Sequence, residues 1–446
     1  MGNRSGPGVA ATVELGVYRF AASVACAATA TELKLGPASS ARRALLEQRL
    51  GRWPAIERHG ERALVWVHAA SLGEVLVAGP LVRRLRARLP QARLLLSCQT
   101  ATGYAAAERL GVDEVRYLPV DHPRHWRTLL DRVRPVLVLF VETEIWPFLL
   151  LALAERGVPA ALVNARISDH SFPRYRLVSA LMARVLSTFA LVAARDRTAR
   201  DRLITLGLGG ERVSITGDLK LDGLDDAEIA ATPDVLAGLR PDGDVLLAIS
   251  THQGEDEAVV DAFAEVRAAH PNAKLVVAPR HPERSAAVVA MAEARGHRVA
   301  RWSAIRTDEQ RGWDVLVVDT SGELRGFMTG AVGAFVGGSL VAVGGHNLLE
   351  PAAFGLPLVA GPHLDGVREQ ADRLSAAGAL AVAHDAAGIG RCWRAWLGDP
   401  KTASAAGRAA REAVRAGRGA LERTLDALEP LLAAVSVEGK HRALAG

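Results

Sequence analysis

The chain has 446 residues, of which 49% are hydrophobic, 23% charged and only 5% aromatic. This composition excludes a disordered chain, and the length exceeds what one hydrophobic core usually supports, so we expect two domains. The formal net charge of +5 is compatible with a phosphate-bearing ligand, an anionic membrane surface or a nucleic acid. The cysteines, Cys26, Cys98 and Cys392, lie too far apart for a disulfide framework or a metal motif, which favours a reducing compartment.

The N-terminal segment 1–50 combines an apolar run with basic flanks. The run FAASVACAATA (20–30) is bounded by Arg19 and Lys34 and is shorter than the roughly 20 residues that span a membrane. Its small residues are compatible with a signal peptide, but Glu14 in the leader argues against one. Such a helix more often lies on a membrane than crosses it. The alternative is an amphipathic helix packed on the first domain.

Two series of apolar runs, typical of buried parallel strands, alternate with helical patterns. The first series is ALVWVH (63–68), RLLLSC (93–98), VLVLFV (136–141), PAALVN (159–164), FALVAA (189–194) and VSITGD (213–218). A polar linker, KLDGLDDAE (220–228), precedes the second series, which is DVLLAIS (244–250), KLVVAP (274–279), DVLVVD (314–319), VGAFVGG (332–338) and PLVAG (357–361). The alternation predicts two doubly wound α/β domains, 51–217 and 218–446, the second ending in an Ala/Arg-rich helical tail.

Polar and glycine residues follow these strands, at the edge where open parallel sheets bind ligands. They are His68, Ser71, Gly73 and Glu74, and the stretches ETEIWP (142–147), STHQGE (250–255), PRHPER (279–284), DTSGEL (319–324) and GGHNLLEP (344–351). We expect the two edges to face each other across a cleft, with the linker as a hinge.

The stretch GGHNLLEP has a structural and a functional interpretation. Asn347 is a predicted N-cap and Glu350 would complete a capping box. The same helix start suits a phosphate, while Gly344 and Gly345 allow a ligand to approach closely. The functional interpretation gains weight because other turns at the same edge carry similar residues.

Seven motifs resemble those of the 3-deoxy-D-manno-octulosonic acid (Kdo) transferases, which build the inner core of lipopolysaccharide. In order from about residue 60 to 365, they are WVHAASLGE, ETEIWP, GDLKLD, STHQGED, PRHPER, DTSGEL and GGHNLLEPAAFGLPLVAGPH. The resemblance implies a GT-B fold, CMP-Kdo as donor, a lipid A precursor (lipid IVA) as acceptor and a membrane-associated N-terminus at the cytoplasmic face of the inner membrane. The chain departs from the family pattern at Leu348, Gln253 and LDGVRE (364–369), near the donor-site rim.

Glu74 is the predicted catalytic base, because it opens a helix after SLG and resembles the family's catalytic glutamate. The alternative is a first-turn glutamate that only favours the helix dipole, which should lower its pKa, whereas a base works best with a raised one. The predicted acceptor-binding residues are Ser71, Gly73, Glu142, Glu144 and Arg166. The predicted donor-binding residues are His252, Pro279, Arg280, Gly322, Glu323, Gly344, Gly345, Asn347, Glu350 and Lys220.

These roles set the expected partners. Arg280 has the fork geometry that suits a phosphate or a carboxylate, and Glu142 and Glu144 would bind sugar hydroxyls or orient Arg166. The cleft-edge loops hold no Asp-x-Asp motif, so we expect no metal, and neither a cofactor nor a nucleic acid partner. The alternatives are another GT-B nucleotide-sugar transferase, a nucleotide-sugar epimerase of similar fold and a non-catalytic two-lobed binding protein.

Overall fold

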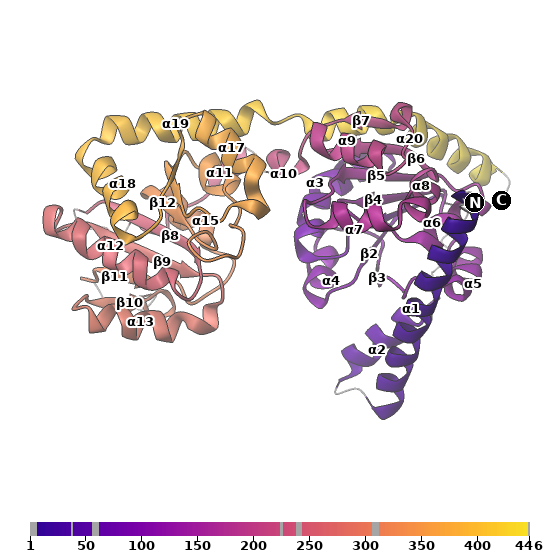
Figure 1. Cartoon of the computed structure of the whole chain (residues 1–446), viewed down its shortest axis with the longest axis horizontal. Helices are drawn as coiled ribbons and strands as arrows, with labels where there is room; N and C mark the ends of the chain where they lie inside the picture. The colour runs from indigo at the N-terminus through magenta and orange to yellow at the C-terminus, as the bar shows by residue number, and fades with distance from the viewer. Residues whose placement is uncertain are drawn as a thin grey trace, which may run out of the picture. The chain divides into compact units, whose positions relative to one another are not determined.

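The computed structural model describes residues 7–36, 39–55, 62–223, 226–237, 243–305 and 312–444. It consists of two compact units: Met1–Gly223 together with Arg418–Gly446, and Leu224–Gly417. Each unit contains a seven-stranded sheet whose strand pairs are all parallel, with helices packed against the sheet (Figure 1). The predicted pair of doubly wound α/β sheets is confirmed.

The first sheet has the order β3-β2-β1-β4-β5-β6-β7. Its strands are β1 (Leu64–His68), β2 (Arg93–Cys98), β3 (Glu114–Tyr117), β4 (Leu137–Val141), β5 (Ala160–Ala165), β6 (Phe189–Ala194) and β7 (Val213–Ile215). Strands β1, β2 and β4 are buried along their whole length, and for this reason they form continuous apolar runs in the sequence. The chain order reverses between β1 and β4, so their carboxyl ends form the switch point where such sheets bind ligands.

The helices of the first unit begin with α1, which is described below. The others are α2 (Ser40–Arg49), α3 (Leu72–Arg88), α4 (Ala101–Glu108), α5 (Pro123–Val133), α6 (Pro147–Glu155), α7 (Ser171–Leu177), α8 (Ser179–Leu186), α9 (Arg197–Thr205) and α10 (Leu219–Asp222), with α20 (Ala420–Leu444) at the end of the chain. Helix α6 begins at Pro147, the last residue of the ETEIWP motif, as expected from proline's preference for the first turn.

Helix α20 packs on the first unit, although its place in the sequence predicted that it belongs to the second domain. Its buried face carries Leu425, Leu428 and Leu432, which join the apolar layer on the α3 side of the first sheet. Arg84 and Arg88 of α3 form ion pairs with Glu422 and Glu429 of α20 at 2.6 and 2.7 Å. This basic face of α3 therefore pairs with the chain's own carboxylates.

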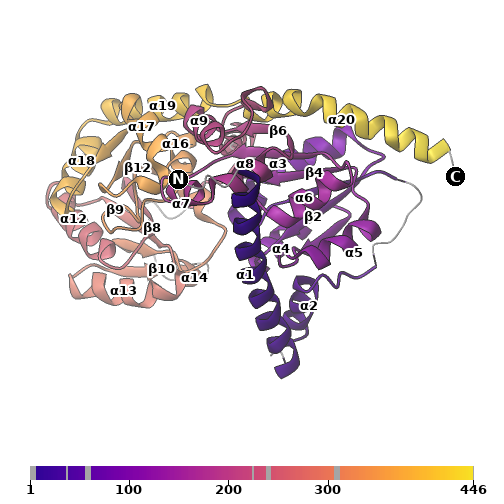
Figure 2. The same cartoon turned by 45° about the vertical axis from the view of Figure 1, so that its right-hand side comes forward.

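Helix α1 (Pro7–Leu35) extends well beyond the predicted apolar run and lies against α8 and α2 (Figures 1 and 2). Ala11, Ala22 and Cys26 are buried residues of this helix. Glu14 accepts the backbone N–H of Leu181 at 2.6 Å, which satisfies a free donor at the start of α8. Glu14, the residue that argues against a signal peptide, therefore faces the protein.

The second sheet has the order β10-β11-β9-β8-β12-β13-β14. Its strands are β8 (Val245–Thr251), β9 (Lys274–Pro279), β10 (Val299–Arg301), β11 (Val315–Val317), β12 (Ala331–Val336), β13 (Leu358–Ala360) and β14 (Leu380–Val382). Its helices are α11 (Asp226–Ala231), α12 (Glu255–Ala269), α13 (Ser285–Ala294), α14 (Trp302–Ile305), α15 (Leu324–Thr329), α16 (Leu349–Ala353), α17 (Arg368–Ala376), α18 (Ala386–Gly398) and α19 (Pro400–Ala416). Here the chain order reverses between β8 and β12.

Candidate functional site

Glu74 lies in the first turn of α3, next to the carboxyl end of β1. Its Oε2 accepts the backbone N–H groups of Ala70 and Ser71, and the Oγ of Ser71 accepts the N–H of Glu74 at 3.4 Å, which makes a complete capping box. At the neighbouring Gly73, an added Cβ would meet no atom closer than the Ser71 Oγ at 3.9 Å, so this side of the turn is open.

The pKa of Glu74 is raised to about 7 although it sits at a helix start. Burial of the carboxylate is the main cause, followed by the charges of Glu144 and then Glu142. The N–H groups of Ala70 and Ser71 lower the pKa but do not offset these effects. Burial and the two neighbouring carboxylates thus raise the pKa of Glu74 despite its place at a helix start. The same side chain both caps α3 and titrates near neutral pH.

Glu142 directly follows β4 and has a left-handed backbone conformation, with a φ of 64°. This conformation is costly for a residue other than glycine, and such residues concentrate at functional sites. Its Oε1 lies 2.9 Å from the Nζ of Lys220, which is on α10 of the same unit. The structure therefore groups Lys220, predicted as a donor-binding residue, with the predicted acceptor-binding residues.

Glu144 is held by His68 and Trp146, neither of which is among the predicted binding residues. Its Oε2 lies 3.0 Å from the Nε2 of His68 and accepts the indole N–H of Trp146 at 2.8 Å. Arg166 enters the same loop through its backbone carbonyl, which accepts a hydrogen bond from Thr143. Its guanidinium makes no ion pair with Glu142 or Glu144 in the described part of the chain.

In the second unit, His252 follows β8 and faces His346. The two Nε2 atoms lie 2.7 Å apart and the rings stack with an interplanar angle of 7°. Burial, followed by the nearby His252 and Arg280, lowers the pKa of His346 to about 4. Pro279 ends β9, and the exposed Arg280 follows it, its backbone N–H bonded to the Thr251 carbonyl at 3.0 Å.

Glu255 is a residue of this region that sequence reasoning missed. It is fully buried at the start of α12. Its carboxylate accepts the backbone N–H groups of His252, Gly338, Ser339 and Leu340 at 2.7–2.9 Å. Glu255 thereby joins the turn after β8 to the turn after β12. An acidic first-turn residue is usually solvated, so no feature of the local pattern indicated this role.

The predicted N-cap at Asn347 and capping box at Glu350 are wrong. Helix α16 begins at Leu349, and the side chain of Asn347 accepts the Leu349 N–H at 3.1 Å. Glu350 instead receives the guanidinium of Arg325 at 2.8 Å. A Cβ at Gly345 would lie 2.7 Å from Val367, so the later segment around Val367 packs against the turn here. Gly344, with a φ of 104°, requires glycine's conformational freedom.

The SGEL turn holds Gly322 and Glu323, two of the predicted donor-binding residues. Helix α15 begins at Leu324, two residues after Gly322. Gly322 has a φ of 94° and open space around the position of a Cβ. The carboxylate of Glu323 is fixed by the indole of Trp302 at 2.9 Å and the hydroxyl of Thr320 at 2.5 Å.

The predicted site residues therefore form two groups, one in each unit. The first group is Ser71, Gly73, Glu74, Glu142, Glu144, Arg166 and Lys220, and the second is His252, Pro279, Arg280, Gly322, Glu323, Gly344, Gly345, Asn347 and Glu350. Among the described residues, no three His, Cys, Asp or Glu side chains gather as metal ligands would. The independence from metal stays a prediction.

Comparisons with known proteins agree with the motifs. The family described as 3-Deoxy-D-manno-octulosonic-acid transferase (kdotransferase) matches residues 44–223. The 3-deoxy-D-manno-octulosonic acid transferase of Haemophilus influenzae is 36% identical over 372 residues, covering 82% of this chain and 87% of that protein. The enzyme of the same name from Bordetella pertussis is 38% identical over 388 residues, covering 83% and 88%.

Solved structures of similar shape confirm the expected GT-B-like fold. The UDP-GlcNAc 2-epimerase from Neisseria meningitidis, bound to UDP-GlcNAc, aligns with a TM-score of 0.58 over 82% of this chain and 100% of its own. Only 12% of the aligned residues are identical, so this likeness shows the fold and not the epimerase activity. The extent and identity of the sequence matches show that the chain belongs to the 3-deoxy-D-manno-octulosonic acid transferase family.

Proposed function

We propose that this enzyme transfers Kdo from CMP-Kdo to a hydroxyl of a lipid A precursor and releases CMP, in lipopolysaccharide inner-core synthesis. The observation that carries the proposal is the carboxylate of Glu74, whose pKa of about 7 lies near neutrality beside the open turn at Gly73. A base with a pKa close to the working pH is effective, because it is ionised yet still basic enough to accept a proton.

In the proposed reaction, Glu74 takes the proton of the acceptor hydroxyl. The acceptor oxygen forms a bond to the anomeric carbon of Kdo, while the bond between that carbon and the CMP phosphate oxygen breaks. The electron pair of the broken bond leaves with CMP. Glu142 and Glu144 would hold acceptor hydroxyls in this step, each already fixed by a partner, Lys220 or His68.

The second unit supplies the proposed donor site. The guanidinium of Arg280 is exposed after β9 and would pair with the CMP phosphate or the Kdo carboxylate. Arg280 lies close enough to His346 for its charge to lower the pKa of that ring. The Nε2 atoms of His346 and His252 bond to each other, so the remaining Nδ1–H of the pair would donate to the same anion. Backbone N–H groups near Gly322 and Gly344 complete the proposed cradle.

The test of the base is Glu74→Gln, assayed with CMP-Kdo and lipid IVA. We expect turnover to fall by roughly 10²–10⁴-fold, as for loss of a general base. The CMP-induced rise in melting temperature should persist, because the donor residues belong to the second unit. Near-normal turnover in this variant would remove Glu74 from the mechanism.

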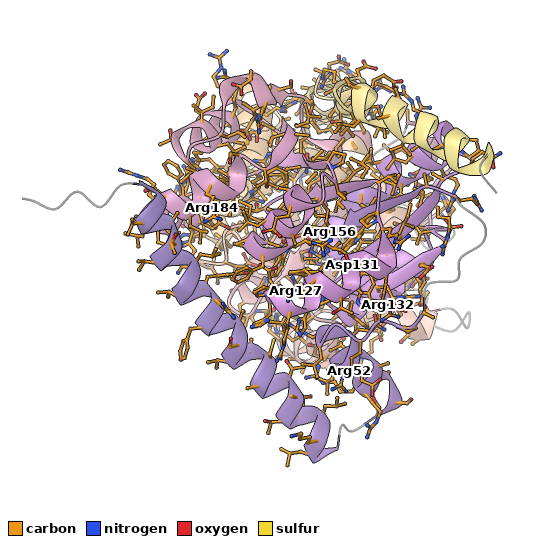
Figure 3. All side chains as sticks on the ribbon, turned by 90° about the vertical axis from the view of Figure 1, so that its right-hand side faces the viewer. Arg52, Arg127, Asp131, Arg132, Arg156 and Arg184 are labelled. Atoms are coloured by element: carbon orange, nitrogen blue, oxygen red, sulfur yellow. The ribbon has the colours of Figure 1, made fainter. Side chains whose placement is uncertain are left out.

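We further propose that α1 lies on the anionic cytoplasmic surface of the inner membrane. Between Val9 and Leu35 the helix is long and apolar enough to cross a membrane, but contacts through Glu14 and Tyr18 hold it on the protein. Its outer face carries a stripe of exposed side chains at helical spacing, Val9, Val13, Val17, Phe20 and Val24, each 54–72% exposed. Figure 3 shows Arg184 close to α1, and Arg127, Asp131, Arg132 and Arg156 farther across the same face of the first unit. Apolar side chains flanked by arginines suit an anionic bilayer.

The test uses the double variant Val17→Asp/Phe20→Asp in the full chain. We expect it to lose binding to phosphatidylglycerol-containing vesicles, and high salt should weaken binding of the native protein. Activity on detergent-dispersed acceptor should remain. Val382→Asp is the matched control, since Val382 is 47% exposed on β14 of the second unit. Undiminished vesicle binding by the double variant would contradict the proposed surface.

A further inference from the structure

A buried chain of hydrogen bonds leads from the core of the first unit to Glu144. The indole Nε1 of Trp66 lies 2.7 Å from the Oγ of Ser97, which lies 2.8 Å from the Nδ1 of His68. The opposite ring nitrogen, Nε2, lies 3.0 Å from Glu144. Trp66, Ser97 and His68 are all fully buried, and the parallel register of β1 and β2 places His68 opposite Ser97.

The chemistry of the partners gives this chain a direction. An indole N–H only donates, so the Ser97 Oγ accepts from Trp66 and its own hydrogen is left for His68. The Nδ1 of His68 then accepts, which leaves the proton of a neutral ring on Nε2, directed at Glu144. The Ser97 carbonyl accepts the Ala69 N–H at 2.9 Å and could also accept from Nδ1, which lies 3.0 Å away, but the Ser97 hydroxyl would then have no acceptor within this chain. Every polar group in the chain is satisfied with a neutral imidazole.

The two glutamates after β4 therefore differ in electrostatic environment. The charge of Glu142 is offset by the ammonium of Lys220 at 2.9 Å. Glu144 receives two neutral donors, His68 and Trp146, on a single oxygen. Its negative charge is stabilised but not compensated.

We propose that Trp66, Ser97 and His68 are positioning residues that hold Glu144 as an uncompensated anion beside Glu74 and thereby set the pH at which the base ionises. This inference rests on the proposed role of Glu74. It agrees with the relative size of the two charges' effects on the pKa of Glu74, since Glu144 raises that pKa more than Glu142 does. If His68 had only a structural role, its two ring nitrogens would need hydrogen-bond partners, but either neutral tautomer would serve.

The surrounding titratable groups come from several elements. They are Glu142 in the loop after β4, His68 on β1, Tyr175 on α7 and Lys220 on α10. Burial and then the charge of Glu144 raise the pKa of Tyr175, so it stays neutral in the relevant range. The donors that His68 and Trp146 present to Glu144 thus decide how strongly its charge acts on Glu74.

The test is the pH dependence of kcat/KM in Ser97→Ala. Without the hydroxyl, Nδ1 of His68 loses its donor and takes a proton of its own. The Ser97 backbone carbonyl, which remains in the variant, accepts this proton, while Nε2 keeps its own proton toward Glu144. The ring is then an imidazolium whose positive charge offsets Glu144 and reduces the negative charge that Glu74 feels. We expect the acidic limb of the profile to move to lower pH by about one unit. Thr100→Ala is the control, because it removes a hydroxyl that caps α4 and leaves the chain to Glu144 intact.

Two readouts separate failure of this inference from failure of the proposed base. If the native enzyme has no acidic limb, the role of Glu74 fails; if the limb is present but stays unmoved in Ser97→Ala, the positioning role fails. The tautomer is measured independently of activity by ¹⁵N NMR of histidine-labelled native protein at pH 7, with the His68 signals assigned by their loss in His68→Gln. We expect the Nε2–H tautomer. An Nδ1–H tautomer or an imidazolium would overturn the inference.

Discussion

The ionised form of Glu74 should destabilise the folded protein, so Glu74→Gln should stabilise it. Burial, together with Glu144, raises the pKa of this carboxyl from 4.5 to about 7. At about 1.4 kcal/mol for each pH unit, ionising Glu74 in the folded state costs at most about 3.5 kcal/mol relative to the unfolded chain. Solvent screening of the partly exposed side chain reduces this figure.

The sign follows from proton binding. Between pH 4.5 and about 7, the folded protein retains the Glu74 proton that the unfolded chain has released. The free energy of unfolding therefore falls as the pH rises through this window. The glutamine side chain of the variant carries no charge at any pH, and its carbonyl oxygen can still accept the N–H groups of Ala70 and Ser71. The variant should match the native protein near pH 4.5 and exceed its stability above pH 7.

The assay is urea or thermal denaturation of both proteins at several pH values between 4.5 and 8. Glu155→Gln provides the control, because Glu155 is exposed at the end of α6 and its replacement removes the same charge. A stability difference for Glu74→Gln that does not change with pH would refute the reasoning. The reasoning would also be refuted if Glu74→Gln were less stable than the native protein at pH 8 but not at lower pH.

Three further predictions concern neighbouring contacts. Lys220→Met leaves Glu142 uncompensated, so the acidic limb of the kcat/KM profile should move to higher pH; an unchanged profile would count against the charge balance described here. Tyr18→Phe removes a hydroxyl bonded to Asp121 at 3.0 Å and should lower stability by about 0.5–1.5 kcal/mol in thermal denaturation, while turnover on detergent-dispersed acceptor persists. Glu350→Ala should sharply reduce the CMP-induced rise in melting temperature, with only a modest drop in the ligand-free value; the reverse pattern would make Glu350 purely structural.

The central strands of both sheets were predictable because a parallel strand covered on two faces must be apolar throughout. Strands β3, β10 and β14 escaped prediction, and each lies at the edge of its sheet. Edge strands are short and partly exposed, so their sequences carry polar residues: β3 reads EVRY and β10 reads VAR. Their existence depends on pairing with a neighbour that is distant in sequence.

Residue types in the site were easier to predict than their partners. Glu74 follows from its motif, but its raised pKa depends on Glu144, which the fold brings close from a different strand end. The capping rule failed at Asn347 for the same reason. The backbone N–H of Leu348 donates to the side-chain oxygen of Gln370 at 3.0 Å, and Glu350 pairs with Arg325. Tertiary contacts therefore replace the local cap.

The buried carboxylate of Asp121 links the proposed membrane helix to the proposed acceptor loop. It accepts the hydroxyl of Tyr18 on α1 and the backbone N–H groups of Phe148 and Leu149 at the start of α6, each at 2.9–3.0 Å. Trp146, just before that helix start, donates to Glu144. Asp121 is thus bonded to α1 on one side and to the end of the loop that carries Glu144 on the other. The position of α1 and the geometry around Glu74, the proposed base, therefore share one structural element. A substitution on the buried face of α1 has to be assayed for turnover as well as for vesicle binding.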